Sequence, residues 1–133
     1  MLEDPPLPGF VGAQSPTAAA QFRVKPFRRT MKYQLVIQFP AETLADLDEM
    51  VALEDRLIAD LGNSAKVDGH DFGSGQANIF IFTSEPEMTF WRVRQRLQQE
   101  GKLGTVTAAH RPMNGDGYTV IWPKDSKEPF SIL

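Results

Sequence analysis

The chain has 133 residues, of which 41% are hydrophobic and 23% are charged, and it contains no cysteine. This length suits one domain with a hydrophobic core, and the composition is typical of globular proteins rather than of disordered or membrane proteins. Without cysteine, disulfides and thiolate metal sites are excluded, and we expect a cytoplasmic location. The formal net charge of −3 argues against nucleic-acid binding, because proteins of that class usually present an excess of Lys and Arg.

Residues 1–30 are predicted to be an extended or disordered N-terminal segment. They contain five of the ten prolines and show neither the helical nor the strand period. They hold four basic and two acidic residues, so the rest of the chain, with ten basic and fifteen acidic residues, is the acidic part. The structured pattern begins at Met31, and we hypothesise that translation starts there.

The first strand and the first helix are predicted between residues 31 and 61. Tyr33, Leu35, Ile37 and Phe39 alternate with more polar residues, which indicates a strand that Pro40 ends. Apolar residues at helical spacing then predict a helix, with Thr43 as its cap and Gly62-Asn63 as its stop. Those residues are Leu44, Leu47, Met50, Val51, Leu57, Ile58 and Leu61, and Glu54 alone interrupts them.

A hairpin, a second helix and another hairpin are predicted to follow. Strands at about 65–72 and 77–83 flank Gly73-Ser74-Gly75, a plausible turn. Ser84-Glu85-Pro86-Glu87 has the form of a capping box and begins a helix that runs to about residue 100, before Gly101. Strands at about 104–111 and 118–122 bracket the turn-forming "PMNGDG".

This order of elements, β-α-β-β-α-β-β, predicts the fold class. It indicates an α+β, ferredoxin-like βαββαβ two-layer sandwich with an additional C-terminal β-strand that extends one edge of the sheet. The predicted domain spans residues 31–123, and residues 124–133 form a C-terminal tail.

One stretch, "VDGHDFGSGQANIFIF", raises the question of a reactive loop. On a regular strand Asp68 and His70 would point the same way, and with Asp71, His110 and Asp116 they could form the site of a small enzyme or ligand-binding domain. Alternatively, the acids hydrogen-bond turn amides and Gly69 permits a bulge. Because the sequence has no metal-binding or phosphate-loop motif, we predict neither a metal nor a cofactor.

Charge distinguishes the two predicted helices. Seven acids and one base lie between Glu42 and Asp60, whereas the second helix carries three arginines. An acidic helix can attract a basic partner, so Asp46, Glu49 and Asp60 are candidate partner-binding residues of a non-enzymatic protein-binding or regulatory module. An immunity-type inhibitor of a basic toxin or nuclease is one concrete version. Alternatively, the two helices neutralise one another.

The strand at 77–83 is apolar on both faces. Phe80 and Phe82 share one face, Ile79 and Ile81 share the other, and either face could be covered by the helices. The remaining face then needs the N-terminal segment, the C-terminal tail or a second subunit as a cover, which makes a homodimer through the sheet a hypothesis. Gln76 and Asn78 stand where an RNA-recognition motif carries stacking aromatics, which again argues against nucleic acid.

Residues 31–122 resemble a small, uncharacterised bacterial α+β protein family. The resemblance rests on "KYQLVIQFP", "ALEDRLI", "VDGHDFGSGQANIFIFT" and "YTVIWP", of which the third is the most distinctive. It implies no activity, substrate or functional residue.

Overall fold

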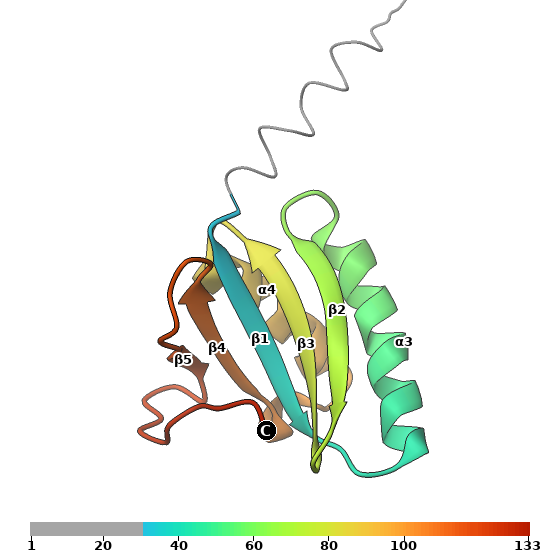
Figure 1. Cartoon of the computed structure of the whole chain (residues 1–133). Coiled ribbons are helices and arrows are strands. Elements are labelled where there is room, and N and C mark those ends of the chain that lie inside the picture. The colour runs from blue at the N-terminus through green and yellow to red at the C-terminus, as the bar shows by residue number, and fades with distance from the viewer. Residues whose placement is uncertain (1–30) are drawn as a thin grey trace, which may run out of the picture. The chain divides into compact units, whose positions relative to one another are not determined.

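The computed structural model describes residues 31–133; the predicted N-terminal segment and its boundary at residue 30 lie outside the described residues. The chain forms, in order, β1 (Tyr33–Pro40), α3 (Leu44–Leu61), β2 (Lys66–Gly73), β3 (Gln76–Thr83), α4 (Pro86–Gln99), a short 3₁₀ helix (Leu103–Thr105), β4 (Thr107–Pro112) and β5 (Thr119–Trp122) (Figure 1). The α+β class and the predicted order of strands and helices are confirmed. Neither α3 nor α4 is both long and apolar enough to cross a membrane.

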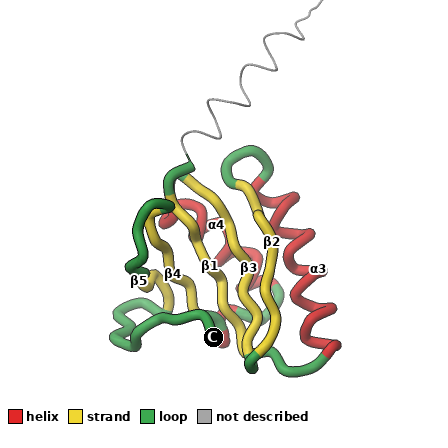
Figure 2. Tube along the Cα trace, viewed as in Figure 1, coloured by secondary structure: helices red, strands yellow, loops and turns green. Residues whose placement is uncertain are grey.

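The strands form one antiparallel sheet in the order β2-β3-β1-β4-β5 (Figure 2). β1 lies at its centre, because it pairs with β3 on one side and with β4 on the other. β5 extends the sheet beyond β4, as the sequence predicts for the additional strand. β2 therefore forms one edge of the sheet, and β5 forms the other.

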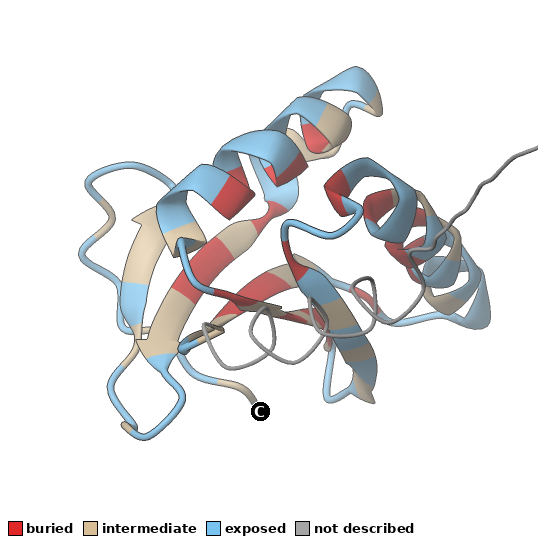
Figure 3. Cartoon of the chain, turned by 90° about the horizontal axis from the view of Figure 1, so that it is seen from above, coloured by how far each residue is buried: buried red, intermediate tan, exposed pale blue. Residues whose placement is uncertain are grey.

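Both helices pack on the same face of the sheet (Figures 1 and 3). The hydrophobic core lies between them and the sheet, and it contains Leu35 and Ile37 of β1 with Ile79 and Ile81 of β3, all fully buried. Since side chains alternate along a strand, Phe80 and Phe82 point to the opposite face. The isoleucines, rather than the phenylalanines, therefore contact the helices.

The C-terminal tail covers part of the opposite face (Figures 1 and 3). The side-chain amide of Gln38 donates to the carbonyl of Ser131 at 3.0 Å, and the amide of Leu133 donates to the side-chain oxygen of Gln76 at 3.0 Å. The ring of Phe130 packs on that of Tyr118, with 4.9 Å between centroids. Of the three covers that the sequence allows, the tail is the one found within residues 31–133.

The turn between β2 and β3 follows from the glycines. Ser74 and Gly75 form a two-residue connection with φ angles of 56° and 81°. Positive φ at both central positions is the geometry that suits the twist of a hairpin, and glycine adopts it without a steric cost. The predicted hairpin turn is confirmed.

The helix starts differ from each other in their capping. The hydroxyl of Thr43 accepts from the amide of Asp46, whose carboxylate accepts from the amide of Thr43, so α3 begins with a complete capping box. The box predicted at Ser84 is wrong, because α4 starts at Pro86 and no side chain caps it. There the hydroxyl of Thr83 accepts from the amide of Glu85 and bonds to the hydroxyl of Thr89.

We expect Thr43→Ala to lower the free energy of unfolding by about 0.5–2 kcal/mol, because it leaves an amide of the first turn of α3 without a partner. Ser84→Ala is the matched control and should change it by less than about 0.5 kcal/mol, since Ser84 caps nothing. Urea denaturation of both variants measures the two values. Equal losses would contradict the capping described for α4.

Candidate functional site

The five residues of the predicted enzyme site do not gather around a common point. Asp68, His70 and Asp71 lie on β2, whereas His110 lies on β4 and Asp116 lies in the loop that follows it. β3 and β1 separate β2 from β4, which places the two strands about 14 Å apart at the usual spacing of ~4.8 Å. Within residues 31–133, no three His, Asp or Glu side chains are grouped as a metal site would require.

A bulge in β2 also separates Asp68 from His70. The register shifts between Val67 and Gly69, so Asp68 is an extra residue in β2. It breaks the alternation of side chains that would have pointed Asp68 and His70 the same way. Val67 packs against the core, and His70 contacts α3 on the same side of the sheet. The bulge that Gly69 was expected to permit is confirmed.

His70 instead pairs with Glu54, which no prediction named as a partner. Its Nδ1 lies 3.0 Å from Oε1 of Glu54, a residue that is only 9% exposed. The second carboxylate oxygen of Glu54 is buried without a hydrogen bond in the described residues. The feature of the sequence that could have indicated this pair is Glu54 itself, the one acid in the apolar stripe of the predicted helix. The pair joins the edge strand β2 to α3.

His110 lies in a separate environment beside α4. Its ring meets that of Tyr33 edge to face at 5.8 Å, and its Nδ1 is buried without a partner in the described residues. Burial lowers the pKa of His110 below its usual value, and the nearby charge of Glu87 opposes this only in part. Burial therefore favours the neutral form of the imidazole, and its Nδ1 has no partner for proton transfer in the described residues.

Of the three predicted partner-binding acids, Asp46 and Asp60 are engaged within the molecule, whereas the side chain of Glu49 stays mostly exposed. Asp46 belongs to the capping box, and the amides of Glu42 and Thr43 lower its pKa by donating to the carboxylate. Glu49 lies 3.8 Å from the ammonium of Lys102. Asp60 accepts two hydrogen bonds from Arg96 of α4, at 2.7 and 2.9 Å, and this arginine lowers its pKa.

A second bidentate pair completes the contact between the helices. Arg56 of α3 donates to both oxygens of Glu100, at 2.8 Å to Oε1, and thereby lowers the pKa of Glu100. Lys102 also lies 3.3 Å from Glu100. These ion pairs support the alternative in which the helices neutralise one another.

An apolar stripe remains exposed on the other flank of α3. Leu44, Val51 and Ile58 are 76%, 36% and 51% exposed. Successive residues of an α-helix are about 100° apart around its axis. Around the axis of α3, these three residues lie within about 40° of one another and about 100° from the middle of the buried side. The exposed carboxylates Asp48 and Asp55 alternate with them along the helix. We call these five residues the outer stripe.

The outer stripe lies on the flank of α3 that faces away from α4. Arg56 and Asp60, which contact α4, lie on the opposite flank. Glu54, next to the stripe, contacts β2. The stripe therefore runs beside the free edge of the sheet. The sequence grouped its three apolar residues with the other apolar positions of the predicted helix, but that pattern is wider than the side of α3 that the sheet covers.

Comparisons of the chain with family models, with curated proteins and with solved structures find no match. The family resemblance stays a prediction, and the function rests on the geometry of the described residues.

We expect Ile58→Gln to change the free energy of unfolding by less than about 0.5 kcal/mol, because half of this side chain is already in water. Leu57→Ala, at the adjacent and fully buried position, should cost about 2–5 kcal/mol. Chemical denaturation compares the two. A large loss in Ile58→Gln would contradict the exposure of this side chain and mean that the stripe contributes to folding.

We expect His110 to make the protein less stable in mild acid. Its folded-state pKa is lowered, so its contribution is complete above its usual pKa near 6.5 and is lost as the pH falls toward the folded value. Thermal unfolding at pH 7.5 and pH 5.5 should therefore show a larger drop in midpoint for the native protein than for His110→Gln. The opposite ranking would contradict the burial of a neutral imidazole.

Proposed function

We propose that the protein is a non-enzymatic protein-binding module whose contact surface is the outer stripe of α3. The observation that carries this proposal is the exposure of Leu44, Val51 and Ile58 in one line. Large apolar residues that recur along one exposed flank of a helix, here with a carboxylate between each pair, form a mixed apolar and acidic surface that suits a protein interface.

The partner that fits this stripe has an apolar surface with basic residues around it. Asp48 and Asp55 alternate with the apolar side chains, and both are exposed. Carboxylates in these positions would attract lysine or arginine on the partner and raise the rate of association. An immunity-type inhibitor of a basic toxin or nuclease is the concrete form of this function that suits such a surface.

A second copy of the chain fits less well than a basic partner. In a two-fold symmetric dimer the same surface patch meets itself. If two outer stripes packed antiparallel around Val51, the carboxylates Asp48 and Asp55 of each copy would come close to those of the other. Repulsion between these like charges opposes self-association through this surface.

The competing function, a small enzyme or ligand-binding domain, has no support from the positions of Asp68, His70, Asp71, His110 and Asp116. They belong to two strands and a loop, and the two histidines lie in different environments. A binding role needs no such convergence.

We also propose that β1, α3, β2, β3, α4 and β4 form a ferredoxin-like core. The order β2-β3-β1-β4, the antiparallel pairing and the two helices on one face support this assignment, with β5 as the additional strand.

A photo-crosslinking experiment tests the binding function. A benzophenone side chain at position 51 of the full chain, expressed in its native host, should give an adduct with a second protein that carries a basic surface. The same group at position 45, exposed on α3 about 100° from Leu44, is the matched control and should give little of this adduct. Asp48→Lys with Asp55→Lys should reduce the adduct about tenfold or more.

Two outcomes would contradict the proposal. Equal adducts from positions 51 and 45 would mean that α3 has no preferred contact surface. An adduct between two copies of the chain alone would assign the outer stripe to a homodimer, which the charges of Asp48 and Asp55 are expected to oppose.

A further inference from the structure

Two large apolar side chains stand exposed near the start of α4. Met88 and Trp91 are 58% and 54% exposed and lie three residues apart, so they are neighbours on the helix surface. The other side of this helix packs on the core through Phe90, Val93 and Leu97.

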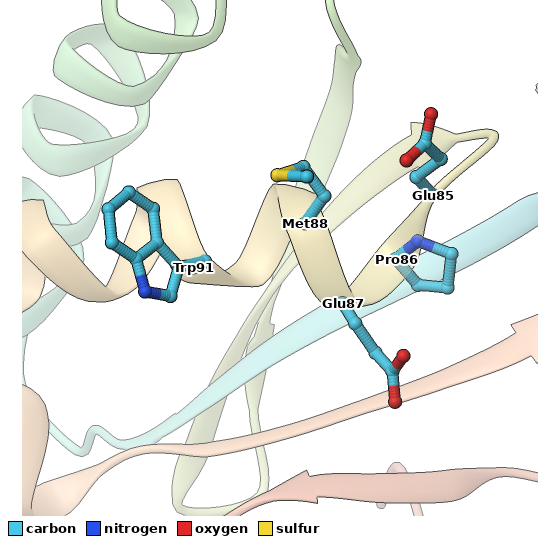
Figure 4. A pocket seen from close by; sticks show the side chains of 5 residues that line it. All are labelled: Glu85, Pro86, Glu87, Met88 and Trp91. Carbon is cyan, nitrogen blue, oxygen red and sulfur yellow. The ribbon is translucent and has the colours of Figure 1, made fainter.

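These side chains line a hollow together with the residues that start the helix. It has a volume of about 710 Å³ and is lined by Glu85, Pro86, Glu87, Met88 and Trp91. Figure 4 shows Trp91 on one side of Met88 and Glu85 and Glu87 on the other, with the two carboxylates directed to opposite sides of the start of the helix. The hollow therefore offers an aromatic ring and a thioether beside two acidic groups.

Arg92, Arg94 and Arg96 of α4 form no ion pair with Glu85 or Glu87 within the described residues. Arg92 donates to the hydroxyl of Ser64 at 3.3 Å, and Arg94 lies 4.8 Å from the ring centre of Trp122. Arg96 is held by Asp60. His110, which feels the charge of Glu87, is kept neutral by burial, as its lowered pKa indicates.

The balance of charge favours a cation over an anion. The start of a helix carries a partial positive charge equivalent to about half an elementary charge, whereas Glu85 and Glu87 supply two full negative charges. Both carboxylates are exposed, and no side chain caps the helix. A phosphate or carboxylate ligand would meet net repulsion here.

We propose that this hollow binds the cationic side chain of an arginine or lysine in an extended basic segment of a partner protein. The alkyl part of that side chain would pack on Met88 and the indole of Trp91. Its charged group would lie over the ring or against the carboxylate of Glu85 or of Glu87. This site is on α4 and is independent of the outer stripe of α3.

Titration of the full-length protein with a short acetylated peptide of alternating glycine and arginine tests the proposal, with the two tryptophan indole N–H signals followed by NMR. The Trp91 signal, assigned with Trp91→Phe, should shift in a saturable way with a Kd of about a millimolar or less. The indole of Trp122 is the internal control, since its N–H donates to the carbonyl of Leu103 at 3.2 Å. It should move little.

Matched variants and a matched peptide separate the charge from other effects. Glu85→Gln with Glu87→Gln should weaken binding about fivefold or more. Asp48→Asn with Asp55→Asn, which removes the same charge from α3, should leave the Kd within about twofold, since these residues lie on another helix. A peptide with citrulline in place of arginine, which is neutral and of similar shape, should not shift the Trp91 signal.

Three results would overturn the proposal: no saturable shift of the Trp91 signal, equal binding of the citrulline peptide, or equal weakening by the α3 variant. Circular dichroism of each variant establishes that it is folded, which is expected because all four substituted acids are exposed. Val51→Ser with Ile58→Ser should leave the arginine peptide bound, so failure of the outer stripe and failure of this site can be told apart.

Discussion

The layer of aliphatic side chains between the sheet and the helices is the constraint on which the rest of the structure depends. Leu35, Ile37, Ile79 and Ile81 project from the two central strands into this layer and are fully buried. Each helix must turn its most apolar side toward them, because this burial is the main favourable contribution to folding. That requirement sets the rotation of α3 and α4 about their axes and decides which side chains remain outside.

The rotation of the helices decides which of their charged side chains form ion pairs and which stay exposed. On the flanks that meet, Arg96 pairs with Asp60 and Arg56 pairs with Glu100. Asp60 thus contributes to the composition of the acidic helix α3 but little to its free surface charge, and Glu100 at the end of α4 is neutralised in the same way. On the flanks that do not meet, acids stand beside exposed apolar groups, as in the outer stripe and in the hollow at Trp91. The acidic surface that is free to contact a partner is therefore smaller than the sequence suggests, and it includes the outer stripe and the hollow at Trp91.

The sheet face away from the helices is a poorer docking surface than its apolar residues suggest. The tail lies against it, held by the amides of Gln38 and Gln76 and by the contact of Phe130 with Tyr118. The C-terminal tail thus covers part of the sheet face for which a second subunit was one of the expected covers. The helical layer offers the surfaces that the described residues leave open, and both combine apolar and acidic groups that suit a basic partner.

The sequence by itself determined the local features of this protein. Periods of two and of about 3.6, the cap at Thr43, the glycine hairpin turn and the bulge at Gly69 each depend on neighbours in the chain, so they could be predicted. The tertiary structure alone decided which flank of α3 stays free, that Glu54 meets His70, and that two strands separate His110 from β2. These features depend on the order of the strands and the rotation of the helices, which residues distant in sequence set through packing.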